Sequence, residues 1–182
     1  MSGLPEGGHH ERGDVNSPLE YSAKKKLGED VQRILAEADA DIAARKPVCQ
    51  ASGRCCKFEA YGHRLYVTAA ELAYFADTIE GVQRREGSDA EGGAKTVSLR
   101  QFFAAEVVEG CPYQIEGLCT AREARPLGCR IYFCDENAQH WQNEVYEKYH
   151  ARLQALHAEH GLPYRYMEWR AALREVTPGP AR

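Results

Sequence analysis

Seven cysteines lie in two separate groups, and this distribution constrains the fold more than any other feature of the sequence. No cysteine occurs before residue 49 and none after residue 134. The groups have the spacings Cys49-x5-Cys55-Cys56 and Cys111-x7-Cys119-x9-Cys129-x4-Cys134. Seven is an odd number, and it is too few in 182 residues for a disulfide scaffold. In a reducing compartment such clusters are more often metal ligands or redox groups than structural bridges.

The donor chemistry favours a soft metal at a centre where the two groups meet. Thiolates bind zinc, iron or iron–sulfur clusters, whereas calcium and magnesium require oxygen ligands. The spacing does not distinguish zinc from iron–sulfur, because Cys-x2-Cys knuckles and ferredoxin spacings are both missing. Sulfur ligation at irregular spacing slightly favours an iron–sulfur cluster held between loops. The predicted ligands are first Cys56, Cys111, Cys119 and Cys129, and then Cys49, Cys55 and Cys134.

A sulfur-rich metal centre needs positive charge close by. Four thiolates around a divalent ion leave about two net negative charges in a poorly solvated pocket. Arg125 and Arg130 lie within a few residues of cysteines, and Arg130 directly follows Cys129. We expect both guanidinium groups to support the ligands by hydrogen bonds to sulfur. The alternative is that they are ordinary surface charges, since 27% of all residues are charged.

Charge and hydropathy argue against two other classes of partner. The chain has 23 Lys+Arg and 27 Asp+Glu, a net charge of -4, so no basic excess indicates nucleic-acid binding. No apolar run approaches the roughly 20 residues needed to span a bilayer, so no membrane contact is expected. The first ten residues lack the basic and apolar regions of a secretory signal. These features predict a cytoplasmic protein.

The sequence predicts a mainly α fold with short extended segments and loops, in a single small domain around the cysteine centre. Residues 1–18 are expected to be a disordered leader and residues 177–182 a frayed tail, leaving a domain over residues 19–176. Apolar residues at spacings of three and four predict helices over 19–46 and 138–174, the latter broken near Gly161. These helices flank a motif core over residues 47–134.

Within the motif core, the pattern predicts one further helix and several irregular segments. Thr68 and Glu71 form a capping box that opens a helix with Leu72, Phe75, Ala76 and Ile79 on its buried side. Residues 58–67 are expected to be extended, residues 84–95 to be a flexible loop, and residues 96–108 could be strand or helix. The histidines at 157 and 160 are expected on a solvated helix face. Shielding of the centre and ordinary core packing are equally open for five aromatic residues: Tyr61, Tyr66, Tyr113, Tyr132 and Phe133.

The two motifs resemble those of the YkgJ-type cysteine-cluster proteins of bacteria. They are Cys49-x2-Ser52-Gly53-x-Cys55-Cys56 and Cys111-Pro112-Tyr113-x3-Gly117-x-Cys119-x5-Arg125-Pro126-x2-Cys129-Arg130-x-Tyr132-x-Cys134. The resemblance covers residues 47–134 and implies a zinc- or iron-chelating domain, or an iron–sulfur oxidoreductase. The family pattern opens Cys-x2-Cys-x2-Cys-Cys, so Ser52 stands where a cysteine is expected. His63 or Asp135 could replace that ligand, or the site uses fewer sulfurs.

Three functions are consistent with these features. The first is a metal-binding centre, holding an iron–sulfur cluster or zinc, with a structural, metal-handling or electron-transfer role. The second is a metal-free thiol–disulfide oxidoreductase, against which the odd number of cysteines counts. The third is a protein-interaction module that the metal merely stabilises, with a partner that the sequence does not identify. The sequence does not decide whether the protein is an enzyme.

Overall fold

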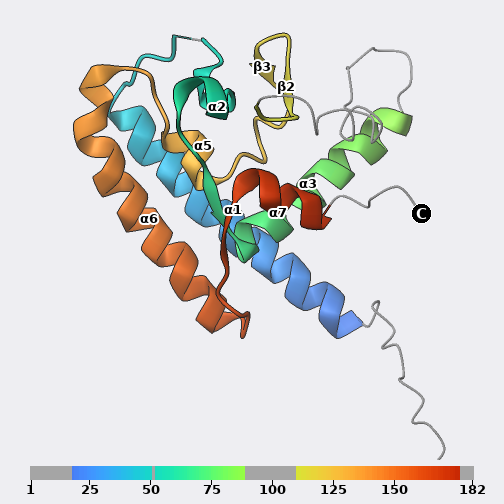
Figure 1. Cartoon of the computed structure of the whole chain (residues 1–182). Coiled ribbons are helices and arrows are strands. Elements are labelled where there is room, and N and C mark those ends of the chain that lie inside the picture. The colour runs from blue at the N-terminus through green and yellow to red at the C-terminus, as the bar shows by residue number, and fades with distance from the viewer. Residues whose placement is uncertain (1–17, 51, 89–109, 177–182) are drawn as a thin grey trace, which may run out of the picture.

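Helices make up most of the residues that the structure describes. The structure is a computed structural model that describes residues 18–50, 52–88 and 110–176 (Figure 1). The long helices are α1 (Pro18–Ala44), α3 (Ala69–Ser88) and α6 (Gln139–Glu159). The shorter ones are η1 (Arg54–Cys56), α2 (Phe58–Tyr61), α5 (Leu127–Ile131), η2 (Glu136–Ala138) and α7 (Trp169–Val176). The prediction of a mainly α protein with short extended segments is therefore confirmed.

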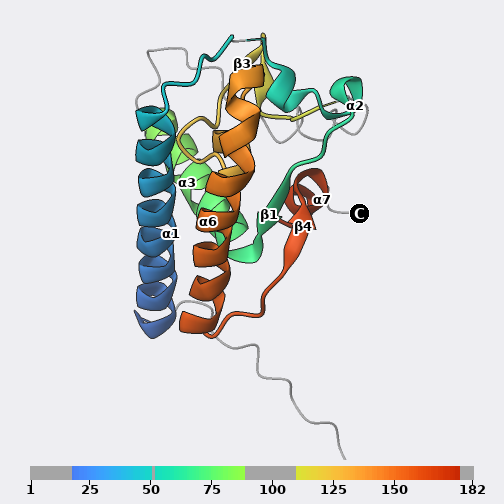
Figure 2. The same ribbon diagram turned by 90° about the vertical axis from the view of Figure 1, so that its left-hand side faces the viewer.

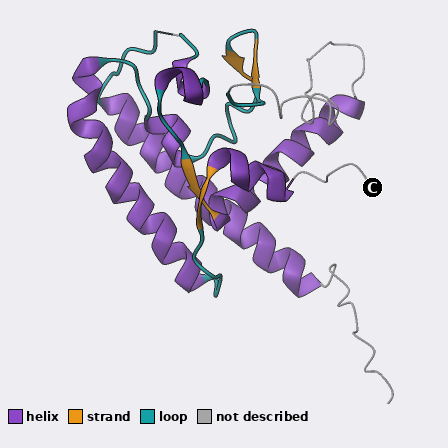
Figure 3. Ribbon diagram, in the orientation of Figure 1, coloured by secondary structure: helices purple, strands orange, loops and turns teal. Residues whose placement is uncertain are grey.

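The strands form two short antiparallel pairs (Figure 3). In the first, β1 (Tyr66–Thr68) pairs with β4 (Tyr166–Glu168), with Val67 opposite Met167. In the second, β2 (Gln114–Ile115) pairs with β3 (Leu118–Cys119) in a tight hairpin. The first pair joins segments about one hundred residues apart in the sequence and so places α7 beside β1 and α3.

Helices α1 and α6 lie side by side along one edge of the molecule (Figure 2). The apolar stripe predicted for α1 is buried, and it packs on a matching stripe of α6, because residues three and four apart share one face of a helix. None of the seven cysteines belongs to this core. The buried residues of the two stripes are Leu27, Val31, Ile34, Leu35, Ala38, Ile42, Trp141, Val145, Tyr149, Leu153 and Leu156.

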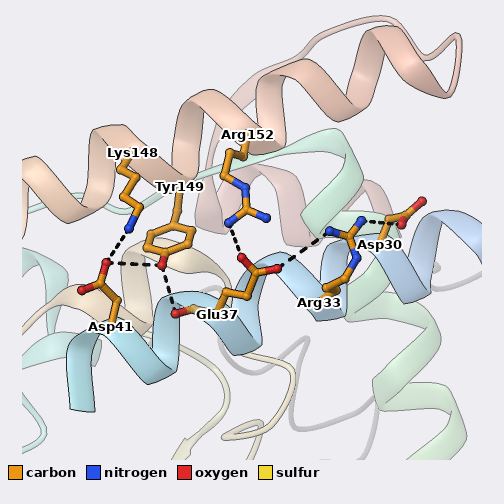
Figure 4. A network of polar contacts seen from close by, with 7 residues as sticks. All are labelled: Asp30, Arg33, Glu37, Asp41, Lys148, Tyr149 and Arg152. Atoms are coloured by element: carbon orange, nitrogen blue, oxygen red, sulfur yellow. Dashed lines mark hydrogen bonds and ion pairs between the residues drawn. The ribbon is translucent and has the colours of Figure 1, made fainter. Parts of the chain in front are cut away.

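A polar network crosses the solvent edge of the same interface (Figure 4). Lys148 Nζ lies 2.8 Å from Asp41 Oδ2, and Arg152 Nη1 lies 2.6 Å from Glu37 Oε2. Tyr149 donates to the carbonyl of Glu37 over 3.0 Å. These mostly exposed ion pairs link α6 to α1 but add little stability.

The predicted capping box opens α3. Thr68 N donates to Glu71 Oε2 over 2.8 Å, and Glu71 N donates to Thr68 Oγ1 over 3.3 Å. The other carboxylate oxygen of Glu71 accepts a hydrogen bond of 2.8 Å from Leu127 N, at the start of α5. Burial raises the pKa of the Glu71 carboxyl. One buried side chain thus joins the first turns of two helices.

Three local expectations were wrong. Residues 58–67 are not extended throughout, because α2 occupies Phe58–Tyr61 and ends where Gly62 turns left-handed, at a φ of 65°. The loop expected over residues 84–95 is wrong for residues 84–88, because α3 continues to Ser88. His157 is buried, at 1% exposure, because the end of α6 packs on the start of α3, where the ring accepts from Ala70 N over 3.4 Å. His160 is half-buried and lies 3.0 Å from Asp30.

Some predicted segments fall outside the described residues. These are the leader over 1–17, the end of the loop over 89–95, the ambiguous segment over 96–108 and the tail over 177–182. Pro18, the last residue assigned to the leader, begins α1. Within the described ranges, no helix combines the length and the apolar character needed to cross a bilayer.

Candidate metal centre

All seven cysteines line one cavity. It has a volume of about 160 Å³ and is bounded by η1, the β2–β3 hairpin, the loop into α5, and the first residue of α7. The two cysteine groups therefore meet in space, as the sequence predicts. Phe75, Tyr113 and Trp169 form an apolar part of the wall, where Phe75 meets each of the other two rings edge to face.

The backbone holds the two groups tightly together. Cys111 N donates to the carbonyl of Cys56 over 2.7 Å, and Gln114 Nε2 donates to the carbonyl of Gly53 over 3.0 Å. Gly110 has a φ of 138°, and a Cβ atom there would lie 2.6 Å from the carbonyl oxygen of Cys56. A side chain at residue 110 would therefore push the second group away from the first.

Three of the cysteine sulfurs interact directly with one another. The Sγ atoms of Cys55 and Cys56 lie 3.9 Å apart, and the Cys56 thiol also hydrogen-bonds Cys111. Donation from Cys56 lowers the pKa of Cys55 to about 6, with a further contribution from the charge of Arg125. The same donor lowers the pKa of Cys111, and its own pKa is raised because it stabilises both neighbours as thiolates.

The remaining cysteines differ in their surroundings. Burial raises the pKa of Cys119 and, more strongly, that of Cys129, which lies on α5. Cys49 is exposed, while Cys134 is half-buried, with its Sγ 3.5 Å from Ser52 Oγ. Ser52, which stands at the position of an expected cysteine, therefore faces another cysteine across the cavity wall.

The chemistry of the side chains in the cavity suits a soft metal, but their positions do not form a ready ligand set. Seven thiols in one half-enclosed cavity suit zinc or an iron–sulfur cluster by their chemistry. However, within residues 18–50, 52–88 and 110–176 no three His, Cys, Asp or Glu side chains are grouped closely enough to hold a metal ion. Binding would therefore require side-chain and loop adjustments around the cavity.

Arg125 and Arg130 both line the cavity, but among the described contacts neither hydrogen-bonds a cysteine sulfur. Arg130 is buried and donates to the carbonyl of Arg125 over 2.6 Å and to that of Glu123 over 2.5 Å, and it pairs with Asp39 of α1. Arg125 donates to the carbonyl of Arg122 over 3.0 Å, and its charge favours the thiolates of Cys55, Cys119 and Cys129. Arg130 thus stabilises the loop before α5 by hydrogen bonds, and Arg125 supplies positive charge.

His63 and Asp135, the possible substitutes for a cysteine ligand at residue 52, do not line the cavity. His63 lies behind it, with Nε2 3.5 Å from the carbonyl of Cys55 and its ring stacked on Tyr132. Its Nδ1 is buried and has no hydrogen-bond partner among the described residues. Asp135 instead accepts from Asn137 N over 3.0 Å.

Of the five aromatic residues considered for shielding or core packing, three line the cavity and two do not. Tyr113, Tyr132 and Phe133 line the cavity, whereas Tyr61 and Tyr66 are exposed, at 47% and 38%, so for these two neither shielding nor core packing is right. No motif in the sequence points to Trp169 or Gln114 as part of the site. The Nε1 atom of Trp169 is buried, and no described residue lies in good hydrogen-bond geometry with it. The indole N–H is nevertheless directed to the Cys111 thiol closely enough to lower the pKa of Cys111.

Comparison with protein-family models, with curated proteins and with solved structures gives no match. The similarity to the YkgJ-type motifs therefore stays a prediction from the residues. The meeting of the two cysteine groups is independent of that similarity, because it follows from the contacts described above.

Proposed function

We propose that the cysteine cavity binds zinc or an iron–sulfur cluster, and we favour the cluster slightly. One observation carries the proposal: seven sulfur atoms from two separate stretches of sequence line a single cavity. Buried cysteines scattered for packing alone would not converge in this way, since a free cysteine acts as a small apolar side chain. When bound, a cluster would supply one-electron chemistry, and zinc would supply a structural cross-link.

The protein's own residues have separable tasks in this proposal. Cys55, Cys56 and Cys111 contact one another, and Cys56 favours the thiolate forms of the other two, which metals require. Arg125 offsets negative charge at Cys55, Cys119 and Cys129. Phe75 and Trp169 exclude water from one wall, which strengthens each sulfur–metal contact in the low-dielectric interior.

Metal analysis of the native protein tests the proposal. We expect protein purified without oxygen to contain a stoichiometric amount of zinc, or of iron with acid-labile sulfide. Zinc without sulfide would exclude the cluster but support the metal site. Protein that is fully reduced, folded and free of metal, and that binds neither metal on reconstitution, would exclude both.

A pair of neighbouring substitutions separates loss of a ligand from damage to the fold. Cys119→Ser removes a sulfur from the cavity wall, whereas Thr120→Ser keeps the hydroxyl that donates to the carbonyl of Tyr113 over 2.9 Å. We expect the first variant to lose metal and the second to retain it, with circular dichroism showing that both stay helical. Equal metal content in the two variants would remove Cys119 from the ligand set.

The contact between Cys56 and Cys111 favours one second candidate, a thiol–disulfide oxidoreductase without metal. Oxidation of these two thiols to a disulfide would release two protons and two electrons, which a disulfide substrate would accept as it becomes two thiols. Counting free thiols before and after mild oxidation tests it. A reversible loss of two thiols with no metal released would favour this candidate over metal binding.

A further inference from the structure

A second cavity shares the wall residue Phe58 with the cysteine cavity. It has a volume of about 440 Å³ and is lined by Phe58, Glu59, Gly62, His63, Arg64, Glu168, Arg170 and Arg174. This volume falls in the range of about 300 to 1,000 Å³ that is usual for small-molecule sites. Phe58 lines both cavities, so α2 forms part of the wall between them.

In this cavity both acidic side chains have partners, whereas two of the three arginines form no ion pair with a described carboxylate. Arg170 pairs with the carboxylate of Glu59, and Glu168 Oε2 accepts from Ala171 N over 2.8 Å at the start of α7. Both acidic side chains of the lining are therefore engaged. Among the described residues, no carboxylate forms an ion pair with Arg64 or Arg174. Three arginines against two glutamates leave a net charge of +1 on these five side chains.

These features favour an anion with several oxygen atoms. Phe58 is the one large apolar side chain among the lining residues, so an apolar ligand would find little contact surface. A guanidinium group presents paired N–H donors that match phosphate and carboxylate oxygens in a bidentate arrangement. Arg64 precedes β1, while Arg174 lies one turn after Arg170 on α7, so donors from two distant segments of the chain meet at this cavity.

We propose that this cavity is a binding site for a phosphate group, held by Arg64 and Arg174. Arg170, which Glu59 fixes in place, completes the positive side of the site. The proposal does not depend on metal binding by the cysteines, because none of the seven cysteines lines this cavity. Inorganic phosphate and a phosphate monoester share the same chemistry, and they are compared as separate ligands in the test.

Isothermal titration of the full chain with inorganic phosphate, and separately with glycerol 3-phosphate, tests the site at low chloride concentration. We expect saturable binding that Arg64→Gln or Arg174→Gln weakens about tenfold or more, because each removes a charge-assisted hydrogen-bond donor. Arg174→Lys keeps the charge without the paired donors and should give an intermediate loss. Tighter binding of the ester would identify a phosphorylated small molecule as the ligand, and equal or tighter binding of inorganic phosphate would identify the free ion.

Arg165→Gln is the matched control. Arg165 lies close in sequence to β4 and pairs with Glu175 over 2.7 Å, but it does not line the cavity. Its substitution should leave binding within about twofold of the original protein, at equal metal content and equal thermal stability. No saturable binding by the original protein at millimolar phosphate would overturn the proposal. Equal binding by the Arg64, Arg174 and Arg165 variants would also overturn it, because the bound ion would then be adventitious.

Discussion

Ser52 and Cys134 face each other at the edge of the cysteine cavity, 3.5 Å apart. A serine hydroxyl is a poor ligand for a soft metal at neutral pH, so this part of the wall offers one thiolate where two could act together. We predict that Ser52→Cys slows loss of bound zinc or iron to a chelator by about tenfold or more. The metal content after timed exposure to the chelator gives the measurement.

The double variant Ser52→Cys, Cys134→Ser provides the control for that prediction. It restores the original number of sulfurs, so its metal should be lost about as fast as from the original protein. Both measurements are made under reductant, because the introduced thiol could otherwise form a disulfide with Cys134. Unchanged metal retention in Ser52→Cys would show that this side of the cavity does not contact the metal.

Glu71 is the buried residue on which two helix starts depend. Its oxygens accept from the backbone N–H groups of Thr68 and Leu127. We predict that Glu71→Ala lowers the free energy of unfolding by about 2 to 4 kcal/mol, because two buried donors lose their acceptor. Glu71→Gln should cost less, since its carbonyl oxygen can still accept from one of them. Urea unfolding measures both values.

The pH dependence of Glu71 has a definite sign. Burial raises the pKa of its carboxyl above the ordinary value of 4.5, so the folded state holds the proton more tightly than the unfolded state does. This contribution is fully present below the unfolded pKa and is lost as pH rises through the folded pKa. The free energy of unfolding of the original protein, relative to Glu71→Gln, should therefore fall as pH rises above 4.5. A difference that grows over that range would contradict the assignment.

At the scale of elements, Arg130 ties α5 to α1 and to the loop between Cys119 and Cys129. Its guanidinium donates to two loop carbonyls, of Glu123 and Arg125, and pairs with Asp39. We predict that Arg130→Met lowers the free energy of unfolding by about 2 kcal/mol, because these carbonyls lose their donor. Metal retention should fall with it, since α5 carries Cys129.

Two further variants sharpen that experiment. Arg130→Lys keeps the charge but cannot reach three acceptors at once, so it should resemble Arg130→Met more than the original protein. Arg33→Met removes an exposed arginine of α1 and should change stability little. Full stability of Arg130→Lys would mean that charge alone, rather than the paired donors, holds the loop.

The elements that the sequence predicts well are those whose signals are local. The helices α1 and α6 follow from an apolar period of three to four residues, and α3 from its capping box at Thr68. Where the prediction fails, the deciding contact is distant or very short. The burial of His157 depends on the start of α3, and α2 is a single turn with too few residues to show a period.

The predictability of the site follows the same division. Clustering predicted that Cys49–Cys56 and Cys111–Cys134 would meet, and the cavity confirms that they do. Which cysteines are neighbours within the cavity depends on the paths of the loops, and the spacing of cysteines in the sequence does not determine those paths. Trp169 reaches the wall of the cysteine cavity only because β4 pairs with β1. No local sequence pattern in either strand predicts that the two strands pair.

At the scale of the whole molecule, the buried side chains form two clusters that differ in sulfur content. The cluster between α1 and α6 contains none of the seven cysteines, whereas the other includes Cys56 and Cys111, with Cys55, Cys119 and Cys129 packed against it. We predict that metal removal destabilises the second cluster more than the first. By hydrogen exchange, amides in residues 111–134 and α7 should lose protection, while those of α1 and α6 keep it.

Leu153→Ala is the reciprocal test. Leu153 is fully buried between α1 and α6, and its truncation should cost about 2 to 5 kcal/mol. Protection should fall in α1 and α6 under this change, with metal content preserved while the protein stays folded. If metal removal and Leu153→Ala produced the same exchange pattern, the two clusters would form a single cooperative unit.

Trp169 imposes an order on biosynthesis. Its backbone N–H bonds the carbonyl of Leu65 over 2.8 Å, and its ring, 2% exposed, forms a wall of the cysteine cavity. The ribosome makes the chain from the N-terminus, so every cysteine is translated before this tryptophan. A nascent chain that ends before Trp169 therefore lacks this wall, and the finished cavity can form only after translation has passed the last cysteine by 35 residues.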